Sequence, residues 1–347
     1  MKKTLAALIV TAFAASAANA AVVYDNEGTK VELNGSLRVI MEKADKKEYD
    51  AANHSTKKSN SALRNAGSRF GITVKHNLDN DFYALGRVEF RFDDTTSRDK
   101  FGGVYAKRAY VGLGSKAIGE LKFGRQLTIA DDLSQAVDYE YGLIPKEEYI
   151  PTAGTGVIRY DYKGIEGLQL SANYNFGQTN DEKGNPLKPG IKNAYAVGAL
   201  YTVGDLDARL AYGHTNFETG ASYAHRLDGV LASLGYKFGD FTLTGDFAYG
   251  HEKFDDEKTN KFYVAPGFAY QVLPASKVYG NYLYERVKGE NTKDKTHGFL
   301  LGADYQLHKQ VVLFVEGKYV TTKEYVNDTY DGKTKDRAIG VGMRVYF

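Results

Sequence analysis

The sequence predicts an all-β fold in which sixteen antiparallel strands close into a barrel. Three observations predict it: a composition that disfavours helices, an alternation of residues with a period of two, and a regular alternation of short and long connections. The chain of 347 residues contains 37 Gly and 27 Tyr, and neither residue type favours a helix interior. Its apolar and aromatic content excludes a disordered chain. The absence of Cys excludes disulfide scaffolds, thiol catalysis and cysteine-ligated metals.

The first twenty residues have the features of an export signal. Lys2 and Lys3 form a basic start, and the apolar stretch that follows is too short to cross a bilayer as a helix. Ala18-Asn19-Ala20 fits a cleavage site. We therefore expect a signal peptide at 1–20 and the mature domain at 21–347, with an uncleaved membrane anchor as the alternative. The mature part has 43 basic and 43 acidic residues, and this neutrality argues against a nucleic-acid binder.

Strands are predicted wherever apolar and polar residues alternate. In the first segment Val31 and Leu33 fall on one face and Glu32 on the other, and only Ile40 is out of place. The least regular segment is 276–288, where Tyr, Asn and Glu mix the two faces. Sixteen segments show the pattern, near 30–42, 68–76, 81–92, 104–114, 118–126, 156–163, 167–176, 193–203, 205–215, 229–238, 240–252, 261–272, 276–288, 297–307, 309–320 and 337–347.

The connections between these segments alternate as regularly as the residues do. Short turns are expected near 77–80, 115–117, 164–166, 204, 239, 273–275 and 308. Long polar loops are expected near 43–67, 93–103, 127–155, 177–192, 216–228, 253–260, 289–296 and 321–336. The alternation predicts an antiparallel meander with all of its large loops at one end.

The number of strands decides which face meets which environment. Sixteen strands enclose an interior too wide for side chains to fill, so the interior holds water and the polar faces point inward. The apolar faces then form an exterior band that is stable only in lipid, and closure removes the unpaired strand edges that hydrocarbon cannot satisfy. Aromatic residues expected at the membrane interface lie beside the short turns, namely Tyr201, Phe238, Phe241, Tyr279, Tyr305 and Phe347. A repetitive secreted β-protein is the alternative.

Several segments together resemble a known family. The export signal, the sixteen strands and the terminal run from Arg337 to Phe347 resemble the general diffusion porins of Gram-negative outer membranes, nearest to the Pasteurellaceae type. The resemblance covers the whole mature chain. It includes the runs Ser68-Arg69-Phe70-Gly71-Ile72, Lys122-Phe123-Gly124-Arg125-Gln126 and Val157-Ile158-Arg159-Tyr160-Asp161.

The resemblance implies a passive channel in the outer membrane for small hydrophilic solutes and ions, without a cofactor. It implies a homotrimer in which each pore is narrowed by an inward-folded third loop and the second loop, with Arg98, reaches over a neighbouring subunit. The alternating last strand with its terminal Phe347 resembles the signal that the outer-membrane assembly machinery reads. Outer-membrane lipids and lipopolysaccharide are the other expected partners, and nucleic acid is not expected.

Motifs for chemistry are weak throughout the chain. Gly332-Lys333-Thr334 is similar to the end of a phosphate-binding loop, but Asn327 stands where the earlier glycine belongs. The seven His residues are dispersed and no pair has helical metal-ligand spacing, so no metal site is predicted. No Gly-x-Ser-x-Gly elbow occurs, although a Ser-His-acid site assembled in space leaves an outer-membrane hydrolase open as an alternative.

Charges in the third long loop predict the narrowest part of the pore. Residues 127–155 contain six acids against the single basic residue Lys146. On the strands, the face expected to point inward carries several arginines. If the loop folds inward, its carboxylates face an arginine wall across a narrow aqueous gap. Such an arrangement creates a transverse field that orients dipolar solutes and separates the paths of cations and anions.

The resemblance assigns individual residues to the two sides of this gap. Arg69 and Arg108 match basic wall positions of the family. Ser36 stands where many relatives carry a basic residue, and Arg38 lies on the same face as a substitute. Arg159 matches a third wall arginine loosely. The loop lacks the Pro-Glu-Phe-Gly-Gly run of the enterobacterial members, and Gly142 aligns with its glutamate. Counting forward from Phe123-Gly124-Arg125 places Asp138 and Glu140 near the acidic loop positions of the family. Together with Asp131 and Asp132 of the same acidic loop, they are the acids expected at the constriction.

Three other functions remain open at this stage. A sugar-specific channel would use an aromatic track, for which the candidates are Tyr105, Tyr110, Tyr139 and Tyr141. An enzyme or an adhesin on the same barrel would give no large, near-ohmic conductance steps in a bilayer, whereas a general porin would. The interpretation favoured by the sequence is a passive porin that is not an enzyme.

Overall fold

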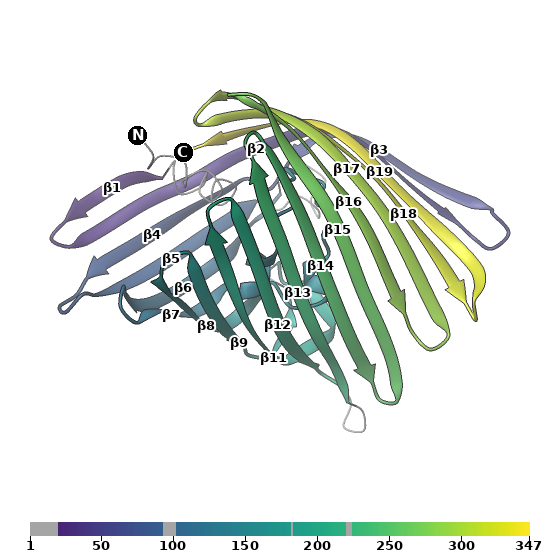
Figure 1. Cartoon of the computed structure of the whole chain (residues 1–347), viewed down its shortest axis with the longest axis horizontal. Coiled ribbons are helices and arrows are strands. Elements are labelled where there is room, and N and C mark those ends of the chain that lie inside the picture. Colours follow the sequence, from purple (N-terminus) through teal and green to yellow (C-terminus); the bar gives the residue numbers. More distant parts are fainter. Residues whose placement is uncertain (1–19, 93–101, 182, 220–223) are drawn as a thin grey trace.

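The computed structural model describes residues 20–92, 102–181, 183–219 and 224–347 (Figure 1). Residues 1–19 of the expected signal peptide and Arg98 lie outside them. Within these ranges no helix has both the length and the apolar character needed to cross a membrane. The strands are β1 Ala21–Asn26, β2 Thr29–Tyr49, β3 Ser55–Asn65, β4 Arg69–Asn77, β5 Phe82–Phe92, β6 Val104–Ser115, β7 Gly119–Leu127, β8 Ala153–Ile165, β9 Leu168–Asn175, β10 Gln178–Asn180, β11 Pro186–Val203, β12 Leu206–Phe217, β13 His225–Phe238, β14 Phe241–Phe254, β15 Glu257–Leu273, β16 Ser276–Lys288, β17 Thr292–His308, β18 Val311–Val326 and β19 Thr329–Tyr346. Two short 3-10 helices, η1 Ile129–Leu133 and η2 Lys146–Glu148, lie between β7 and β8.

The strands form one closed antiparallel sheet. Sixteen of them form the wall of the barrel, and β19 pairs with β2 to close it. The three remaining strands, β1, β3 and β10, pair with parts of β2 and β11. Each of the sixteen predicted segments overlaps one of these sixteen wall strands, so the predicted strand number is confirmed.

The strands at the long-loop end are longer than predicted. Most of the stretches 43–67, 253–260, 289–296 and 321–336 continue as paired strands with short turns. Beyond the apolar band a strand meets water on both faces, so it no longer needs apolar alternation to remain a strand. The prediction of loops there was wrong because it relied on that alternation alone. The hairpin of β1 with β2 was missed as well.

Apolar side chains cover the outside of the barrel wall, as predicted. On β19, Ile339 and Val341 are 57% and 54% exposed, whereas Ala338 and Gly340, which alternate with them, are buried. The same alternation recurs on β17, where Phe299 and Leu301 are exposed. An exterior band of this kind matches a hydrocarbon environment.

Some apolar side chains depart from this arrangement because they point inward, and two of them concern predictions from the sequence. Ile40, the exception in the first predicted strand, is fully buried beside Phe314 and Ala338. Tyr279 was expected in the interfacial aromatic set, but it is fully buried and donates its hydroxyl to Glu316. That expectation was wrong for Tyr279. The set members Tyr201, Phe238, Tyr305 and Phe347 are exposed.

The carboxyl-terminal residue completes the closure of the barrel. The backbone of Phe347 accepts a hydrogen bond from Gly35 N–H at 2.8 Å and donates one to the Gly35 carbonyl at 3.1 Å. Its ring lies over Gly35, where an added Cβ would come within 2.6 Å of a ring carbon and 2.7 Å of the Arg69 carbonyl oxygen. The absence of a side chain at Gly35 therefore allows the last residue to pack.

We expect Gly35→Ala to destabilise the barrel, because the added methyl overlaps ring and backbone atoms. Overpacking of this kind costs about 1–3 kcal/mol. The temperature at which the detergent-folded barrel loses its heat-modifiable mobility on electrophoresis should fall. Gly245→Ala is the control, because a Cβ there has no heavy atom within 4 Å. Equal transition temperatures for the two variants would contradict the expectation.

Candidate functional site

The segment from Thr128 to Thr152 connects β7 to β8 without forming a strand. Its two ends are joined, because Thr128 N–H donates to the Thr152 carbonyl at 2.9 Å. The Thr128 side chain caps η1 by accepting from Ala130 N–H. We call residues 128–152 the third-loop segment. Because a hydrogen bond joins its two ends, the segment leaves and re-enters the barrel wall at one place.

One part of the third-loop segment packs against an apolar surface of the barrel wall. Ile129, Leu133, Tyr149 and Ile150 form a buried cluster with small wall residues such as Ala196, Ala211 and Ala248 of β11, β12 and β14. A Cβ at Gly213 on β12 would lie 2.6 Å from Ile150 Cγ2. The wall is thus hollowed by Gly and Ala where the segment lies against it.

Another part of the segment is held by buried carboxylates of the wall. Glu316 of β18 accepts the backbone N–H groups of Tyr139, Glu140 and Tyr141 at 2.7, 2.8 and 2.6 Å. Because Glu316 is fully buried, these charge-assisted bonds are protected from water.

Further hydrogen bonds hold the part of the segment that precedes Tyr139. Asp246 of β14 accepts from the Ser134 hydroxyl at 2.7 Å and from Gln135 N–H at 3.1 Å. Asn281 of β16 donates to the Val137 carbonyl at 2.7 Å. The segment is therefore fastened along its length to inward-facing residues of β14, β16 and β18.

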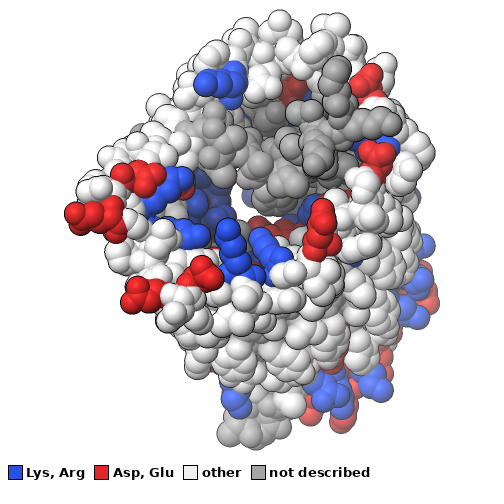
Figure 2. Space-filling model, turned by 60° about the vertical axis from the view of Figure 1, so that its left-hand side comes forward, with Lys and Arg blue, Asp and Glu red and all other residues white. Residues whose placement is uncertain are grey.

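A pocket of about 550 Å³ brings arginines and segment carboxylates together. We call it the arginine pocket; its wall carries Arg38, Arg69, Arg87, Arg91, Arg108 and Arg344. Asp131, Asp132 and Glu147 of the third-loop segment also line it. Figure 2 shows Lys and Arg side chains gathered along the rim of a hollow in the molecule.

One wall carboxylate serves several of these arginines. Glu89 of β5 lies 2.9 Å from Arg87 and from Arg91, and 3.8 Å from Arg108. The buried Nε atoms of Arg87, Arg108 and Arg344 have no hydrogen-bond partner among the described residues. The wall therefore carries more positive than negative charge, since Glu89 is the carboxylate that these arginines share.

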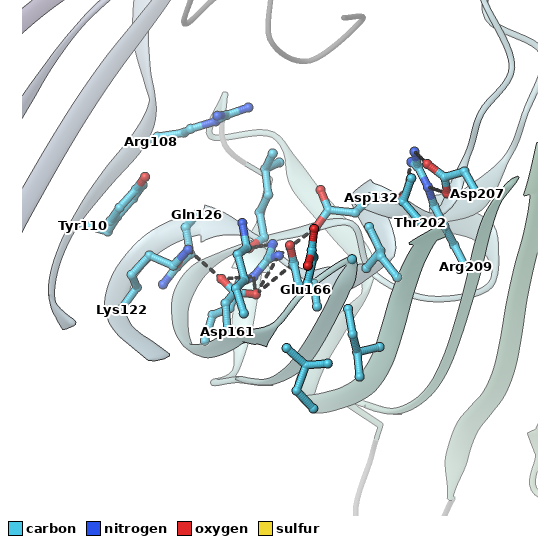
Figure 3. A pocket seen from close by; sticks show the side chains of 18 residues that line it. Arg108, Tyr110, Lys122, Gln126, Asp132, Asp161, Glu166, Thr202, Asp207 and Arg209 are labelled. Atoms are coloured by element: carbon cyan, nitrogen blue, oxygen red, sulfur yellow. Dashed lines mark hydrogen bonds and ion pairs between the residues drawn. The ribbon is translucent and has the colours of Figure 1, made fainter. Parts of the chain in front are cut away.

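A second pocket, of about 630 Å³, adjoins the first (Figure 3). Here Arg159 pairs with Asp132 at 2.6 Å and with Asp161 at 3.0 Å. Lys122 lies 2.7 Å from Asp161 as well. Arg108 and Asp132 line both pockets. Arg159 and Asp132 therefore balance each other instead of facing across open space.

The predicted site residues thus fall into separate places. Arg38, Arg69, Arg108 and Asp131 meet in the arginine pocket, whereas Glu140 forms an ion pair with Arg64 at 2.7 Å.

Asp138 is exposed to solvent yet has protein on several sides. Desolvation by that protein, followed by repulsion from Glu316, raises the pKa of Asp138 to about 6. Asp138 therefore takes up a proton at a higher pH than an ordinary surface aspartate, while its carboxyl remains mostly ionised at pH 7.

Sequence reasoning missed several members of the site. Arg87 and Arg91 belong to the predicted arginine wall but were not singled out as site residues, and Arg344 was assigned only to the inward face. Glu147 was counted only among the six acids of the loop. The parity of β5 and β19 could have selected the three arginines. No local pattern marks Arg64 as the partner of Glu140, because the contact joins segments far apart in sequence.

Two alternative kinds of ligand site find little support. Tyr139 stacks on Phe314 at 4.7 Å and bonds to Asp304, and Tyr141 is buried, so neither offers an open ring to a sugar. The described residues contain no group of three or more His, Asp and Glu side chains placed to hold a metal ion.

Comparison with known proteins places these features in a family context. The sequence model described as Gram-negative porin matches residues 4–341. The major outer membrane protein of Pasteurella multocida (strain Pm70) is 32% identical over 379 aligned residues, covering 100% of both chains. The trimer form of OmpT, an outer membrane protein of Vibrio cholerae, has a TM-score of 0.71 at 17% identity over 92% of this chain and 100% of that one. An anion-selective porin from Comamonas acidovorans has a TM-score of 0.66 at 19% identity over the same shares.

We expect Glu316→Gln to loosen the third-loop segment, because an amide replaces one acceptor oxygen by a donor. Hydrogen bonds to charged groups contribute about 1.5–3 kcal/mol each, so local opening should become about tenfold more frequent or more. Trypsin cleavage after Lys146 should accelerate accordingly. Glu324→Gln is the control, because it lies on the same face of β18 but is exposed. Unchanged cleavage in Glu316→Gln would show that the segment is held by other contacts.

Proposed function

The chain belongs to the family of Gram-negative porins, and from this premise we propose that the third-loop segment narrows its pore to a charged gap. As a member of this family the protein is a passive channel of the outer membrane. The proposed gap has the arginines of the arginine pocket on one side and Asp131 and Glu147 on the other. The fastening of the segment to β14, β16 and β18 supports this placement.

The charge arrangement in the arginine pocket is the observation that carries the proposal. Six arginines lie on the wall, and three of them, Arg87, Arg91 and Arg108, share Glu89 as their close carboxylate. The segment contributes Asp131 and Glu147 to the same pocket. Opposite charges that are fixed to separate elements keep a field across the water between them. Solutes with a dipole would orient in that field, and cations and anions would pass along different sides.

The field acts over a short range in physiological salt. The Debye length is about 8 Å at 0.15 M, so charges on the outer hairpins are largely screened from the gap. The segment and the wall nearest to it should therefore set ion preference. No chemical step is part of this function.

We further propose that the protein assembles as a trimer. Of the small outward residues Val31, Gly35 and Val39 on β2, Gly35 is covered by the ring of Phe347, whereas Val31 and Val39 would allow barrels to pack closely. The trimeric form of the structurally similar Vibrio protein is in line with this proposal. A monomer mass by sedimentation in mild detergent would contradict it.

Export and assembly complete the proposal. Residues 1–20 would direct export and be removed. Phe347 would form part of the assembly signal, which is supported by its place at the end of the closing strand β19.

We expect Asp131→Asn combined with Glu147→Gln to shift the ion preference of the pore toward anions. The substitutions remove two negative charges that face the arginines, and they leave the wall intact. The reversal potential of single channels in a planar bilayer under a salt gradient measures the shift. Asp255→Asn with Asp256→Asn, at the tip of the β14–β15 hairpin, removes the same charge far from the gap.

Three outcomes of this recording would decide among the functions. Equal reversal potentials for both double variants would exclude the proposed gap. Wild-type steps blocked by a sugar at low concentration would favour the specific channel instead. Large steps that remain unblocked support the general porin.

A further inference from the structure

An arginine at the base of the outer hairpin β2–β3 reaches the third-loop segment. The hairpin lies at the long-hairpin end of the barrel (Figure 1), and Arg64 is the next-to-last residue of β3. Arg64 lies opposite Ile40 of β2, which is buried on the inner side of the wall. Its neighbour Leu63 is 63% exposed on the outer side. Because side chains alternate along a strand, Arg64 points inward.

Arg64 holds two carboxylates at once, one from the wall and one from the third-loop segment. Its Nε and Nη2 donate to the two carboxylate oxygens of Glu42 on β2, each at 2.8 Å. Its Nη1 lies 2.7 Å from a carboxylate oxygen of Glu140 in the segment. This arrangement uses the planar fork of a guanidinium, which the ammonium group of a lysine does not reproduce.

The segment makes a second contact with the same wall carboxylate. Tyr141 donates its hydroxyl to Glu42 at 2.9 Å, and Tyr141 directly follows Glu140 in the chain. The contacts therefore form a closed ring through Arg64, Glu42, Tyr141 and Glu140. We call these four residues the Arg64 clamp.

Burial makes the Arg64 clamp more rigid than an ion pair at the surface. The side chains of Arg64, Glu42 and Glu140 are 15%, 8% and 12% exposed. Salt screens such partly buried pairs much less than exposed ones. Removal of one partner leaves the other charge buried without its counter-charge, which is strongly unfavourable. The clamp therefore holds the side chain of Glu140 in one direction.

The Arg64 clamp and Glu316 act on different parts of the same three residues. Glu316 accepts the backbone N–H groups of residues 139–141, and these bonds do not decide where the side chains point. The clamp fixes the side chains of Glu140 and Tyr141. Among the described residues, the segment carboxylates that line the arginine pocket are those of Asp131, Asp132 and Glu147, and Glu140 is held elsewhere.

The support of Arg64 is itself connected to the arginine pocket. The next residue, Asn65, is fully buried and accepts a hydrogen bond from Ser68 N–H at 2.8 Å. The hydroxyl of Ser68 accepts the backbone N–H of Arg38 at 2.8 Å. Arg38 is one of the arginines that line the pocket. The residue that holds Glu140 and the positive side of the gap are therefore parts of one hydrogen-bonded frame.

We propose that Arg64 is a positioning residue that decides which carboxylates of the third-loop segment face the gap. It neutralises Glu140 and holds it against the base of the outer hairpin, so that Asp131 and Glu147 supply the negative side. Release of Glu140 would add a third carboxylate to the water of the pore and favour cations. The effect on ions rests on the proposed gap, whereas the hold on residues 139–141 does not.

A substitution that conserves charge separates geometry from electrostatics. Arg64→Lys keeps the positive charge and loses the guanidinium fork. Arg337→Lys is the matched control, because Arg337 binds Asp45 through Nε and Nη2 on the outward face of β19. Hydrogen–deuterium exchange of the full-length barrel in detergent measures the protection of the backbone at 139–141. We expect exchange there to become about tenfold faster in Arg64→Lys and to stay at the wild-type rate in Arg337→Lys.

Reversal potentials in a salt gradient test the direction of Glu140. Arg64→Lys leaves the net charge unchanged, so a shift toward cations reports a rearranged carboxylate. We expect this shift, and we expect the addition of Glu140→Gln to remove it. Glu140→Gln alone weakens the clamp from the side of the loop and should also speed exchange at 139–141. It keeps the proposal testable if Arg64→Lys does not fold.

Several results would overturn the proposal. Wild-type exchange at 139–141 in Arg64→Lys and in Glu140→Gln would do so, and so would equal acceleration in Arg337→Lys. An unshifted reversal potential in Arg64→Lys, or a shift that persists after Glu140→Gln is added, would exclude the role of Glu140. Failure of the gap itself gives a different result: Asp131→Asn with Glu147→Gln then matches its control, while exchange still responds to Arg64→Lys.

Discussion

Closure of the hydrogen-bonded sheet is the constraint on which the rest of this structure depends. In hydrocarbon an unpaired backbone N–H or carbonyl has no water partner, so every strand must find two neighbours. The pairing of β19 with β2 supplies the last neighbour, and Phe347 and Gly35 extend it to the final residue. Because closure forces each side chain either outward or inward, a period of two in the sequence becomes a division between lipid and water.

The third-loop segment depends on the side chains that the barrel wall directs inward. It needs an inner wall that is not uniformly polar, because its Ile129, Leu133 and Tyr149 must be buried. Small residues on β11 to β14 provide the space, and the buried Glu316 provides acceptors for three consecutive backbone N–H groups. Wall and loop therefore specify each other, and the arginines that share a pocket with Asp131 and Glu147 gain a fixed geometry from contacts made elsewhere in the barrel.

The sequence could predict features that depend on neighbouring residues, but not those that depend on contacts between residues far apart in the chain. The sixteen strands and the inward direction of Arg38, Arg69 and Arg108 were predictable, because parity is a local property. The pairing of Glu140 with Arg64 was not, because the path of the loop is set by distant contacts. The irregularities at Ile40 and in 276–288 carried information that went unused: Ile40, Tyr279 and Leu283 break the pattern where apolar loop residues pack on the inner wall.

Beyond the apolar band, the same period of two separates side chains by the sign of their charge instead of by polarity. Within the band it separates apolar from polar side chains, whereas in the outer hairpins it separates cations from acids, as Lys293-Asp294-Lys295 illustrates. A slip of one residue between β18 and β19 would reverse both at once, turning Ile339 and Val341 into the lumen and Asp336 toward the outer surface. Two independent penalties for the same error make the register of these long hairpins strongly specified. That register in turn places Lys323 and Lys333 on the outer face of the sheet and Arg344 of β19 within the arginine pocket.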